Sequence, residues 1–429
     1  MRQNTPDQGG AQAVLETVRS CMQVVMSEAG LEMLRLAMDE EVTSLTGARY
    51  DRDQSGACRR AGSAPGTVLV EAQPRSIRRP RVRRRGGHGA EIPLTTYRDA
   101  QCPLELQHRI LEALSAGLSS RSVSAVVSPA RGTSRSASSR LWCQAGTRWI
   151  QEFRSRRLVD DWSVLMIDGI RLSADQTSVV AMGITTDGIK KLLDFEVGSN
   201  ENAEVCRSLL VRMVERGFPS DAPVLVVSDG SAAIHRAVVE ILPEAVIQRC
   251  LVHKERNLRA TLSRRHHGEL GRLFNGLRLV QGHEAGSEAL GAIRRFLVQH
   301  SARSVASLDE AGDELLTVHS LEVPSTLHVS LLSTNAIENV FHSSRIKINR
   351  VTRFRADTDQ AERWMTYACI HVERGLRRIR GHADLPALMA ALRRRREAAR
   401  SASGAASPVA RCARSLPGGA RRAGLRETV

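Results

Sequence analysis

Several classes of protein are excluded by what this sequence lacks. It contains no apolar run of about 18 residues, the minimum length of a membrane-spanning helix, so a transmembrane role is excluded. Its eight cysteines show no regular spacing, unlike the disulfide frameworks of small secreted proteins. No secretory signal pattern is apparent at the N-terminus either. Together these absences predict a cytoplasmic protein with reduced thiols.

Lysine is also scarce, and nearly all the positive charge comes from arginine. The 429 residues include 62 Lys and Arg against 46 Asp and Glu, a net charge of +16, yet lysine occurs only at Lys190, Lys191, Lys254 and Lys347. A GC-rich genome would explain the preference for arginine, but not the net charge. Such a basic chain predicts a polyanionic partner, nucleic acid or an anionic membrane, and no amphipathic membrane helix supports the second. Arginine suits bidentate contacts to phosphate.

Much of this charge lies in two N-terminal segments. In "PRSIRRPRVRRRGGHG" (74–89), arginines alternate with Ile77 and Val82, which predicts a short basic strand or hairpin; a solvated charge run is the alternative. Residues 104–156 predict two helices around a Ser/Gly-rich turn, which is typical of a helix-turn-helix but also of two ordinary packed helices. We expect contacts to DNA here and on a later helix near residue 340. The expected contact residues are Arg75, Arg78, Arg79, Arg81, Arg83, Arg84, Arg85, Arg135, Arg140, Arg345 and Lys347.

The centre of the chain changes to β-rich patterning. Apolar runs with many β-branched residues, bounded by turn-type residues, predict strands. A helix follows the third strand over 199–217, with Ser199 or Asn200 as its cap, and two further strand–helix pairs come after it. This β-β-β-α-β-α-β-α order predicts a mixed sheet with helices packed on it. The predicted strands cover residues 163–168, 177–184, 191–198, 224–229 and 245–252.

Two of these strands end in an acid followed by glycine. "VLMIDG" ends at Asp168 and "VLVVSDG" at Asp229. A carboxylate is disfavoured inside a strand that is buried on both faces, but ligands of open α/β sheets bind at the carboxyl ends of the strands. Two such acids on neighbouring strands repel each other unless a cation lies between them, and oxygen ligands suit Mg²⁺ or Mn²⁺. For either acid alone, an ordinary Asp-Gly turn is the alternative.

A metal site for phosphoryl transfer needs a third carboxylate, and Glu338 in "STNAIENVFHSSRIK" is the candidate. At helical spacing, Glu338, His342, Arg345 and Asn349 share one polar face, so a metal ligand and a phosphate contact can lie close together. The alternative is a capping box of Asn335 and Glu338, in which the glutamate only satisfies backbone donors.

The three acidic segments, in this order, resemble those of the Mutator-type bacterial insertion-sequence transposases, a DDE family with a ribonuclease-H-like catalytic core. The resemblance covers about residues 30–392 and includes "RPRVRRRGGHGAEIPLTTY", "RCLVHKERNL" and "RIRGHADLPALMAAL". It implies an α/β fold: a ribonuclease-H-like mixed sheet interrupted by a helical insertion and preceded by a mainly helical, DNA-binding N-terminal region. It also implies that Asp168, Asp229 and Glu338 are catalytic and hold two Mg²⁺ or Mn²⁺ ions.

Two residue pairs carry less specific parts of the resemblance. The family often has a Cys/Asp-x-x-His pair after the second acid, which here is Cys250 and His253. Two ligands do not make a zinc site, so we expect a structural or substrate-positioning role, or an indirect role through contact with the metal ligands. Arg363 and Trp364 resemble another family pair, for which DNA contact and simple packing of the tryptophan are both open.

The resemblance implies a transposase that binds the terminal inverted repeats of an insertion sequence, nicks DNA and joins the freed 3′-hydroxyl to another strand. Pairing two ends requires a homodimer or a higher oligomer. A structure-specific nuclease on the same core and an inactive, end-binding repressor are the alternatives, and the serine-rich stretch 128–146 favours the second. The expected segments are a flexible arm (1–28), a helix with a basic β/loop region (29–103), a helical, candidate helix-turn-helix region (104–158), the first part of the catalytic core (159–258), a helical insertion (259–333), the closing helices (334–392) and a disordered basic tail (393–429).

The charge leads to a first prediction about DNA binding. If about six phosphates are neutralised, the logarithm of the affinity for duplex DNA should fall with a slope of roughly −5 against the logarithm of the salt concentration. Titrations of a labelled duplex at several salt concentrations measure this slope. A nearly flat dependence would refute binding dominated by phosphate contacts.

Overall fold

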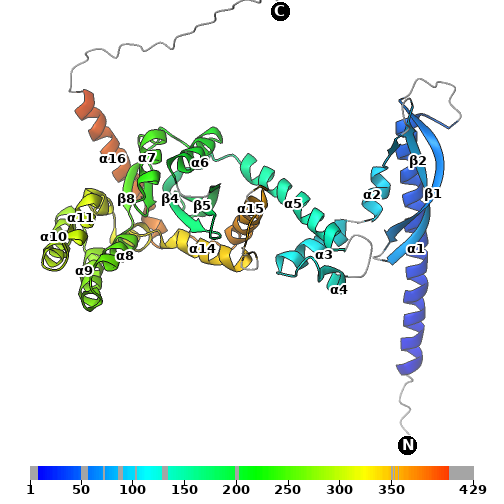
Figure 1. Cartoon of the computed structure of the whole chain (residues 1–429), viewed down its shortest axis with the longest axis horizontal. Coiled ribbons are helices and arrows are strands. Elements are labelled where there is room, and N and C mark those ends of the chain that lie inside the picture. The colour runs from blue at the N-terminus through cyan, green and yellow to red at the C-terminus, as the bar shows by residue number, and fades with distance from the viewer. Residues whose placement is uncertain are drawn as a thin grey trace, which may run out of the picture. The chain divides into compact units, whose positions relative to one another are not determined.

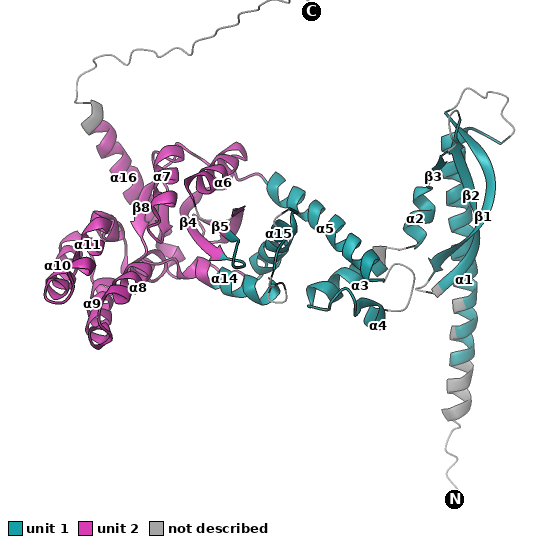
Figure 2. Cartoon of the chain, viewed as in Figure 1, with its two compact units in different colours: residues 1–156, 171–177, 339–375 teal, residues 157–170, 178–338, 376–429 magenta. Residues whose placement is uncertain are grey.

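The computed structural model shows a mainly helical N-terminal region and a mixed α/β region (Figure 1). The chain falls into two compact units, one formed by residues 1–156, 171–177 and 339–375, the other by 157–170, 178–338 and 376–429 (Figure 2). The structure describes residues 8–49, 57–70, 73–85, 90–101, 104–127, 134–198, 202–348, 351, 353–355 and 357–404.

The first unit begins with a long helix packed on a hairpin. Helix α1 (Gln8–Thr46) lies along the antiparallel strands β1 (Cys58–Val70) and β2 (Gln73–Arg84), with β3 (Glu91–Ile92) and α2 (Thr95–Gln101) beside them (Figure 1). The predicted basic hairpin is confirmed, and Ile77 and Val82 of β2 are both buried in the core that includes Met38 and Val42 of α1. We expected a flexible arm over residues 1–28, but α1 already begins at Gln8. Residues 1–7 lie outside the described part. The small core between helix and hairpin contains Met38, Val42, Val68, Ile77 and Val82.

The rest of the first unit is helical. It contains α3 (Leu104–Ser115), α4 (Val123–Val127), α5 (Arg135–Ser155), most of α14 (Asn335–Ile348) and α15 (Gln360–Glu373). We expected 334–392 to supply the closing helices of the catalytic core. Instead, α15 packs on α5, and residues 339–375 belong to the first unit.

Aromatic residues, only 3% of the chain, concentrate where α5 and α15 meet. Trp142 of α5 lies 4.5 Å from Trp364 of α15 and 5.3 Å from Tyr367, measured between ring centroids. Gly146 leaves room for Arg363, since a Cβ atom there would come within 2.5 Å of that side chain. The structure therefore supports the packing interpretation of the Arg363–Trp364 pair.

The second unit contains a five-stranded mixed sheet, as predicted. The strands are β4 (Trp162–Arg171), β5 (Thr177–Thr185), β6 (Lys190–Gly198), β7 (Leu225–Ser228) and β8 (Val246–Arg249), in the order β6-β5-β4-β7-β8. Strands β4, β7 and β8 are parallel. Short turns join β4 to β5 and β5 to β6, so these neighbours run in opposite directions.

Helices pack on this sheet and follow it along the chain. Helices α6 (Ala203–Glu215) and α7 (Ala232–Ile241) bury an apolar core against it. The cap of α6 is Asn202, whose side chain accepts from the amide of Val205, so the expected capping by Ser199 or Asn200 is wrong; both lie outside the described residues. The remaining helices are α8 (Leu251–Thr261), α9 (His267–Leu279), α10 (His283–Val298), α11 (Ala302–Ala311), α12 (Thr317–Ser320), α13 (His328–Leu331) and α16 (Leu385–Gly404).

Helix α16 changes the interpretation of the tail. We expected disorder from residue 393, but the helix continues to Gly404 and its Arg396 pairs with Glu244 at 3.1 Å. Residues 405–429 of the predicted disordered tail lie outside the described part. None of the helices in the described ranges is apolar over a length that could cross a membrane.

A buried ion pair links β6 to α6. Asp194 is fully buried and accepts from Arg212 at 3.0 Å, with Arg216 at 3.3 Å. Its other oxygen accepts from the amide of Phe195 at 2.8 Å. Two guanidinium groups and a backbone amide thus offset the cost of burying this carboxylate.

We predict that Asp194→Ala destabilises the fold strongly. It would leave two largely buried arginine side chains with less opposite charge, and losing one partner of a buried pair costs about 3–5 kcal/mol of unfolding free energy. Urea unfolding followed by circular dichroism measures the loss. The control is Asp309→Ala, which breaks an exposed pair with Arg294 and should have a much smaller effect. Equal effects of the two variants would contradict the prediction.

Candidate metal centre

Adjacent parallel strands carry the first two predicted acids. The described pairing of β4 with β7 ends at Ile167 opposite Ser228, so Asp168 and Asp229 follow on neighbouring strands. Strand β4 does not end at Asp168, as we expected, but continues to Arg171, because it remains beside β5 as far as the turn between Leu172 and Gln176. Asp168 is therefore only 5% exposed, whereas Asp229 is half-buried.

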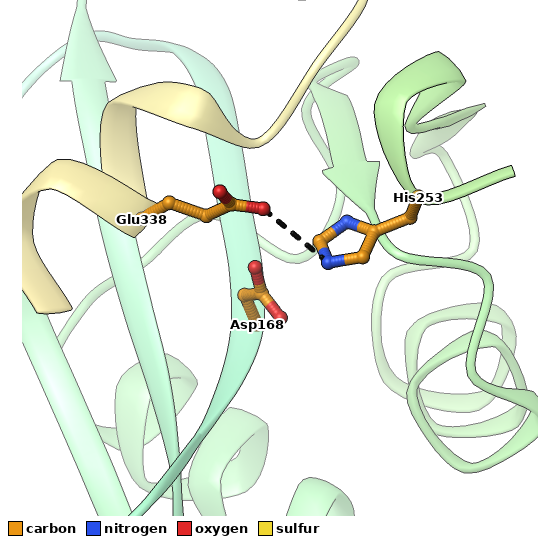
Figure 3. A group of neighbouring side chains, drawn as sticks. All are labelled: Asp168, His253 and Glu338. Carbon is orange, nitrogen blue, oxygen red and sulfur yellow. Dashed lines mark ion pairs between the residues drawn. The ribbon is translucent and has the colours of Figure 1, made fainter. Parts of the chain in front are cut away.

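The third predicted acid reaches the same place from α14. Ligand atoms of Asp168, His253 and Glu338 all lie within 4.8 Å of one another (Figure 3). Glu338 Oε1 lies 3.3 Å from His253 Nε2, the contact marked in Figure 3. The side chains come from β4, α8 and α14, which are far apart in sequence. The described residues thus bring Asp168 and Glu338 together, with His253 rather than Asp229 as the third member.

Asp229 lies just outside this group. One of its carboxylate oxygens accepts from the amide of Ser231 at 2.8 Å, as in an Asp turn. It is still close enough to Asp168 to contribute to the raised pKa of that carboxyl. The structure thus places Asp229 beside the group without directing it into the contact between Glu338 and His253.

Two neighbours of His253 fix the orientation of its ring. Cys250 is the N-cap of α8, and its sulfur accepts from the amides of His253 at 3.4 Å and of Thr334 at 3.3 Å. The Thr334 hydroxyl lies 3.1 Å from His253 Nδ1. With Nδ1 held there, Nε2 faces Glu338. The sequence interpretation missed Thr334; its only signal is its position directly before α14.

The sequence contained a signal that His253 belongs with Asp168 and Glu338, which we did not use. β8 is the third parallel strand and ends at Arg249, so the Cys-x-x-His pair begins at the same edge of the sheet as the two acids. The rule that predicted ligands at the ends of β4 and β7 applies equally to β8.

The electrostatics of the group are shaped by burial. Burial raises the pKa of Asp168 to about 7; the positive charge of His253 opposes this rise, and the negative charge of Asp229 adds to it. The hydrogen bond with Cys250 is the largest cause that raises the pKa of His253, to about 9, and the charges of Asp168 and Glu338 add to it, against the effect of burial. Near neutral pH the imidazolium therefore offsets part of the carboxylates' negative charge.

The donor set fits a divalent cation. Glu338 Oε1 is buried and makes no hydrogen bond; its nearest cation is His253 Nε2 at 3.3 Å, an ion-pair contact without hydrogen-bond geometry, so the oxygen can still accept from or ligate another group. The capping-box alternative loses support, because α14 begins at Asn335 and the amide of Glu338 donates to the carbonyl of Thr334 at 3.0 Å. Carboxylate oxygens of Asp168, Asp229 and Glu338 suit Mg²⁺ or Mn²⁺.

A buried arginine supports the turn that bears Asp229. Arg249 donates to the carbonyl of Gly230 at 2.8 Å and to both oxygens of Glu310 at 2.8 and 2.9 Å. Gly230 has a positive φ of 90°, and a Cβ atom there would lie 2.8 Å from Arg249 Nε, so only glycine fits. Because Glu310 belongs to α11, this arginine connects the helical segment after β8 to the Asp229 turn.

The predicted DNA-contact residues lie on three elements. On and just after β2, Arg75, Arg78, Arg84 and Arg85 are exposed, whereas Arg79, Arg81 and Arg83 are half-buried. Arg135 and Arg140 are exposed on α5, as are His342, Arg345 and Lys347 on α14; Asn349 lies outside the described residues.

Glu91 neutralises part of the charge of β2. It lies 2.6 Å from both Arg79 and Arg81, and the hydrogen bonds from Arg81 and Arg79 lower its pKa to about 2. Two of the seven arginines thus have a carboxylate partner, and Arg75, Arg78 and Arg85 donate to Ser27, Ser63 and the carbonyl of Cys58. The arginines also line two grooves beside α1, of about 920 and 610 Å³, where the structure adds basic residues that we did not predict as contacts. The added residues are Arg35, Arg49 and Arg60.

Comparison with known proteins agrees with the resemblance seen in the sequence. A family described as "Transposase, Mutator family" matches residues 8–370. The transposase for insertion sequence element ISRM5 of Rhizobium meliloti (strain 1021) is 28% identical over 341 residues, 76% of this chain and 79% of the relative.

Two further relatives align over a shorter part of the chain. The transposase for IS905 of Lactococcus lactis subsp. lactis (strain IL1403) is 27% identical over 55% of this chain and 61% of the relative, so less than two thirds of that protein is spanned. The transposase for IS6120 of Mycolicibacterium smegmatis is 28% identical over 55% of this chain and 75% of the relative.

The site geometry predicts an unusual histidine titration. In metal-free protein, His253 should stay protonated until the pH approaches about 9. The stability that its charge contributes to the folded state is therefore fully present below about pH 6.5 and is lost as the pH rises towards 9. Cys250→Ala should lower this pKa, while Cys250→Ser, which keeps an acceptor, should preserve more of it. Histidine-labelled NMR titration in EDTA measures both.

His319 is the internal control for this titration, because burial lowers its pKa. The two histidines should therefore titrate on opposite sides of the ordinary value. Titration of His253 near pH 6.5 in the wild type would contradict the geometry around Cys250.

Proposed function

The chain belongs to the Mutator family of transposases, and we propose from this that it binds the terminal inverted repeats of an insertion sequence, nicks DNA and transfers the freed 3′-hydroxyl to another strand. The observation that carries the proposal is the approach of Asp168 and Glu338, 170 residues apart in sequence, with a buried carboxylate oxygen that makes no hydrogen bond. Asp229, one residue beyond the β4–β7 pairing, would complete a triad of acids.

We further propose that the core is ribonuclease-H-like. Three strands joined by short turns, followed by two parallel strands on the other side of β4, suit such a core. The elements between β8 and α14 are all helical in the described part of the chain, which suits an insertion ahead of the third acid.

Asp168, Asp229 and Glu338 would hold two Mg²⁺ or Mn²⁺ ions. When bound, these ions would lower the pKa of the attacking water or 3′-hydroxyl and stabilise the leaving 3′-oxygen. The residues of the chain have separate tasks. His253 offsets the charge of the carboxylates, Cys250 and Thr334 hold its ring, and the exposed Arg256, 3.9 Å from Glu338, offers a cation to the DNA phosphates. No covalent intermediate with the enzyme is needed.

DNA would be held mainly through phosphates. The exposed arginines of β2 and the grooves beside α1 would bind the element ends without reading much sequence. Arg345 and Lys347, exposed on α14, would add further phosphate contacts. Pairing of two ends would require at least a dimer.

Single substitutions of the acids test this proposal. Asp168→Asn, Asp229→Asn and Glu338→Gln each keep side-chain size and remove one ligand charge, so nicking and joining should both fall to the level measured without divalent metal. Folding and DNA binding should persist, because the arginine-rich hairpin does not use the metal. Assays with labelled element ends and Mg²⁺ or Mn²⁺ measure all three steps. Asp309→Asn, at an exposed acid, is the matched control.

The other outcomes separate the alternatives. If Glu338→Gln unfolds α14 while cleavage by the soluble fraction stays normal, the glutamate is structural. Cleavage of branched DNA without any joining would favour a structure-specific nuclease. Binding of ends by the wild type, with neither cutting nor joining in either metal, would favour an end-binding repressor.

A further inference from the structure

Helix α1 has two apolar faces, and the described residues of the chain cover only one of them. Towards the hairpin, Ser27, Met38 and Val42 are buried. On the opposite side, large apolar side chains are 49% to 71% exposed. In Figure 1 the N-terminal part of α1 extends beyond the hairpin. The exposed stripe consists of Val18, Met22, Val25, Met26, Met33 and Leu36, with the exposed Ala29 among them.

The stripe is regular. At about 100° per residue its members fall within an arc of roughly 100°, and it extends for about 27 Å along the helix. Successive members of the stripe are separated by steps of 4, 3, 4, 4 and 3 residues. The members in this order are Val18, Met22, Val25, Ala29, Met33 and Leu36. This is an eleven-residue repeat, whose period of about 3.67 residues per turn keeps a stripe nearly parallel to the axis. Isolated exposed apolar residues need no explanation, but a continuous stripe marks an interface.

The charges beside the stripe indicate what covers it. Glu28 and Glu32 are exposed along one edge, and Arg35 is paired with Glu32 at 2.8 Å. The acidic edge disfavours DNA and also an anionic membrane surface, because interfacial membrane helices carry Lys and Arg on their polar face. A protein surface with a matching uncharged stripe remains, and an identical α1 provides one.

We propose that α1 pairs with the α1 of a second copy of this chain through the stripe from Val18 to Leu36. Joining two copies would cover on the order of 1,200 Å² in total, which reaches the size of a stable interface. The opposite face of each helix keeps its own basic hairpin, so the dimer would present two sets of hairpin arginines. The inference concerns assembly alone and does not depend on the chemistry proposed for Asp168.

Adjacent residues of α1 provide a matched test. Val25 lies in the stripe and is 65% exposed, whereas Val24 is 53% exposed but lies outside the arc. In the full chain, Val25→Glu would bury two carboxylates in an apolar seam. We expect its dimerisation to weaken at least about tenfold, a change of about 1.4 kcal/mol. Val24→Glu, with the same change in charge and helix propensity, should leave it unchanged.

Sedimentation velocity at micromolar concentrations, without DNA, measures the assembly. The wild type and Val24→Glu should sediment at twice the chain mass of 47.0 kDa, and Val25→Glu near the single mass. Circular dichroism checks that all variants fold. Chains with oppositely charged substitutions should form a dimer again when they are mixed. If the two helices are parallel, Val25→Glu should pair with Val25→Lys; if they are antiparallel, Val25→Glu should pair with Ala29→Lys. A monomeric wild type, or a dimer that persists in a Val25→Glu/Leu36→Glu variant, would overturn the proposal.

Discussion

The parallel pairing of β4 with β7 is the contact on which the rest of the site depends. Its register sets Asp168 and Asp229 on neighbouring strands, one residue beyond the last described pair. A shift by one residue would turn Asp168 to the other face of the sheet, because successive side chains of a strand alternate. The apolar residues of β4 and β7, buried under α6 and α7, oppose such a shift. The position of the acids is thus maintained by core packing on the opposite side of the sheet.

Buried charge is handled differently at the metal centre and elsewhere in the same unit. Asp194 has two arginine partners, and Arg249 has both Glu310 and the carbonyl of Gly230. At the centre, by contrast, Asp168 and Glu338 share one half-buried histidine, the exposed Arg256 lies 3.9 Å from Glu338, and one oxygen of Glu338 has no hydrogen bond. Two carboxylates held together with so little positive charge favour the binding of a cation. The contrast is what the proposed cation site requires, whereas Asp194 and Arg249 form structural ion pairs.

Arginine has two roles in the first unit. Some side chains of β2 are tied to Glu91, while others remain exposed beside the grooves along α1. The paired arginines maintain the hairpin as a rigid support, and the exposed ones are available to phosphate. The charge of the segment alone therefore overstates the number of DNA contacts that it can make.

The sequence alone predicted the strands, their order along the chain and the helix of Glu338, because apolar periodicity and turn residues act locally. It did not show that β4 continues past Asp168 to Arg171. It could not decide what covers each apolar face or which polar groups meet. Only the tertiary structure shows Thr334 and Cys250 orienting His253, Asp229 turned towards Ser231, and α15 packed on α5. The bond between Thr334 and Cys250 joins residues 84 positions apart, and the contact between Trp142 and Trp364 joins residues 222 positions apart. They depend on how whole elements pack, and a local sequence pattern does not indicate which distant residue a side chain will contact.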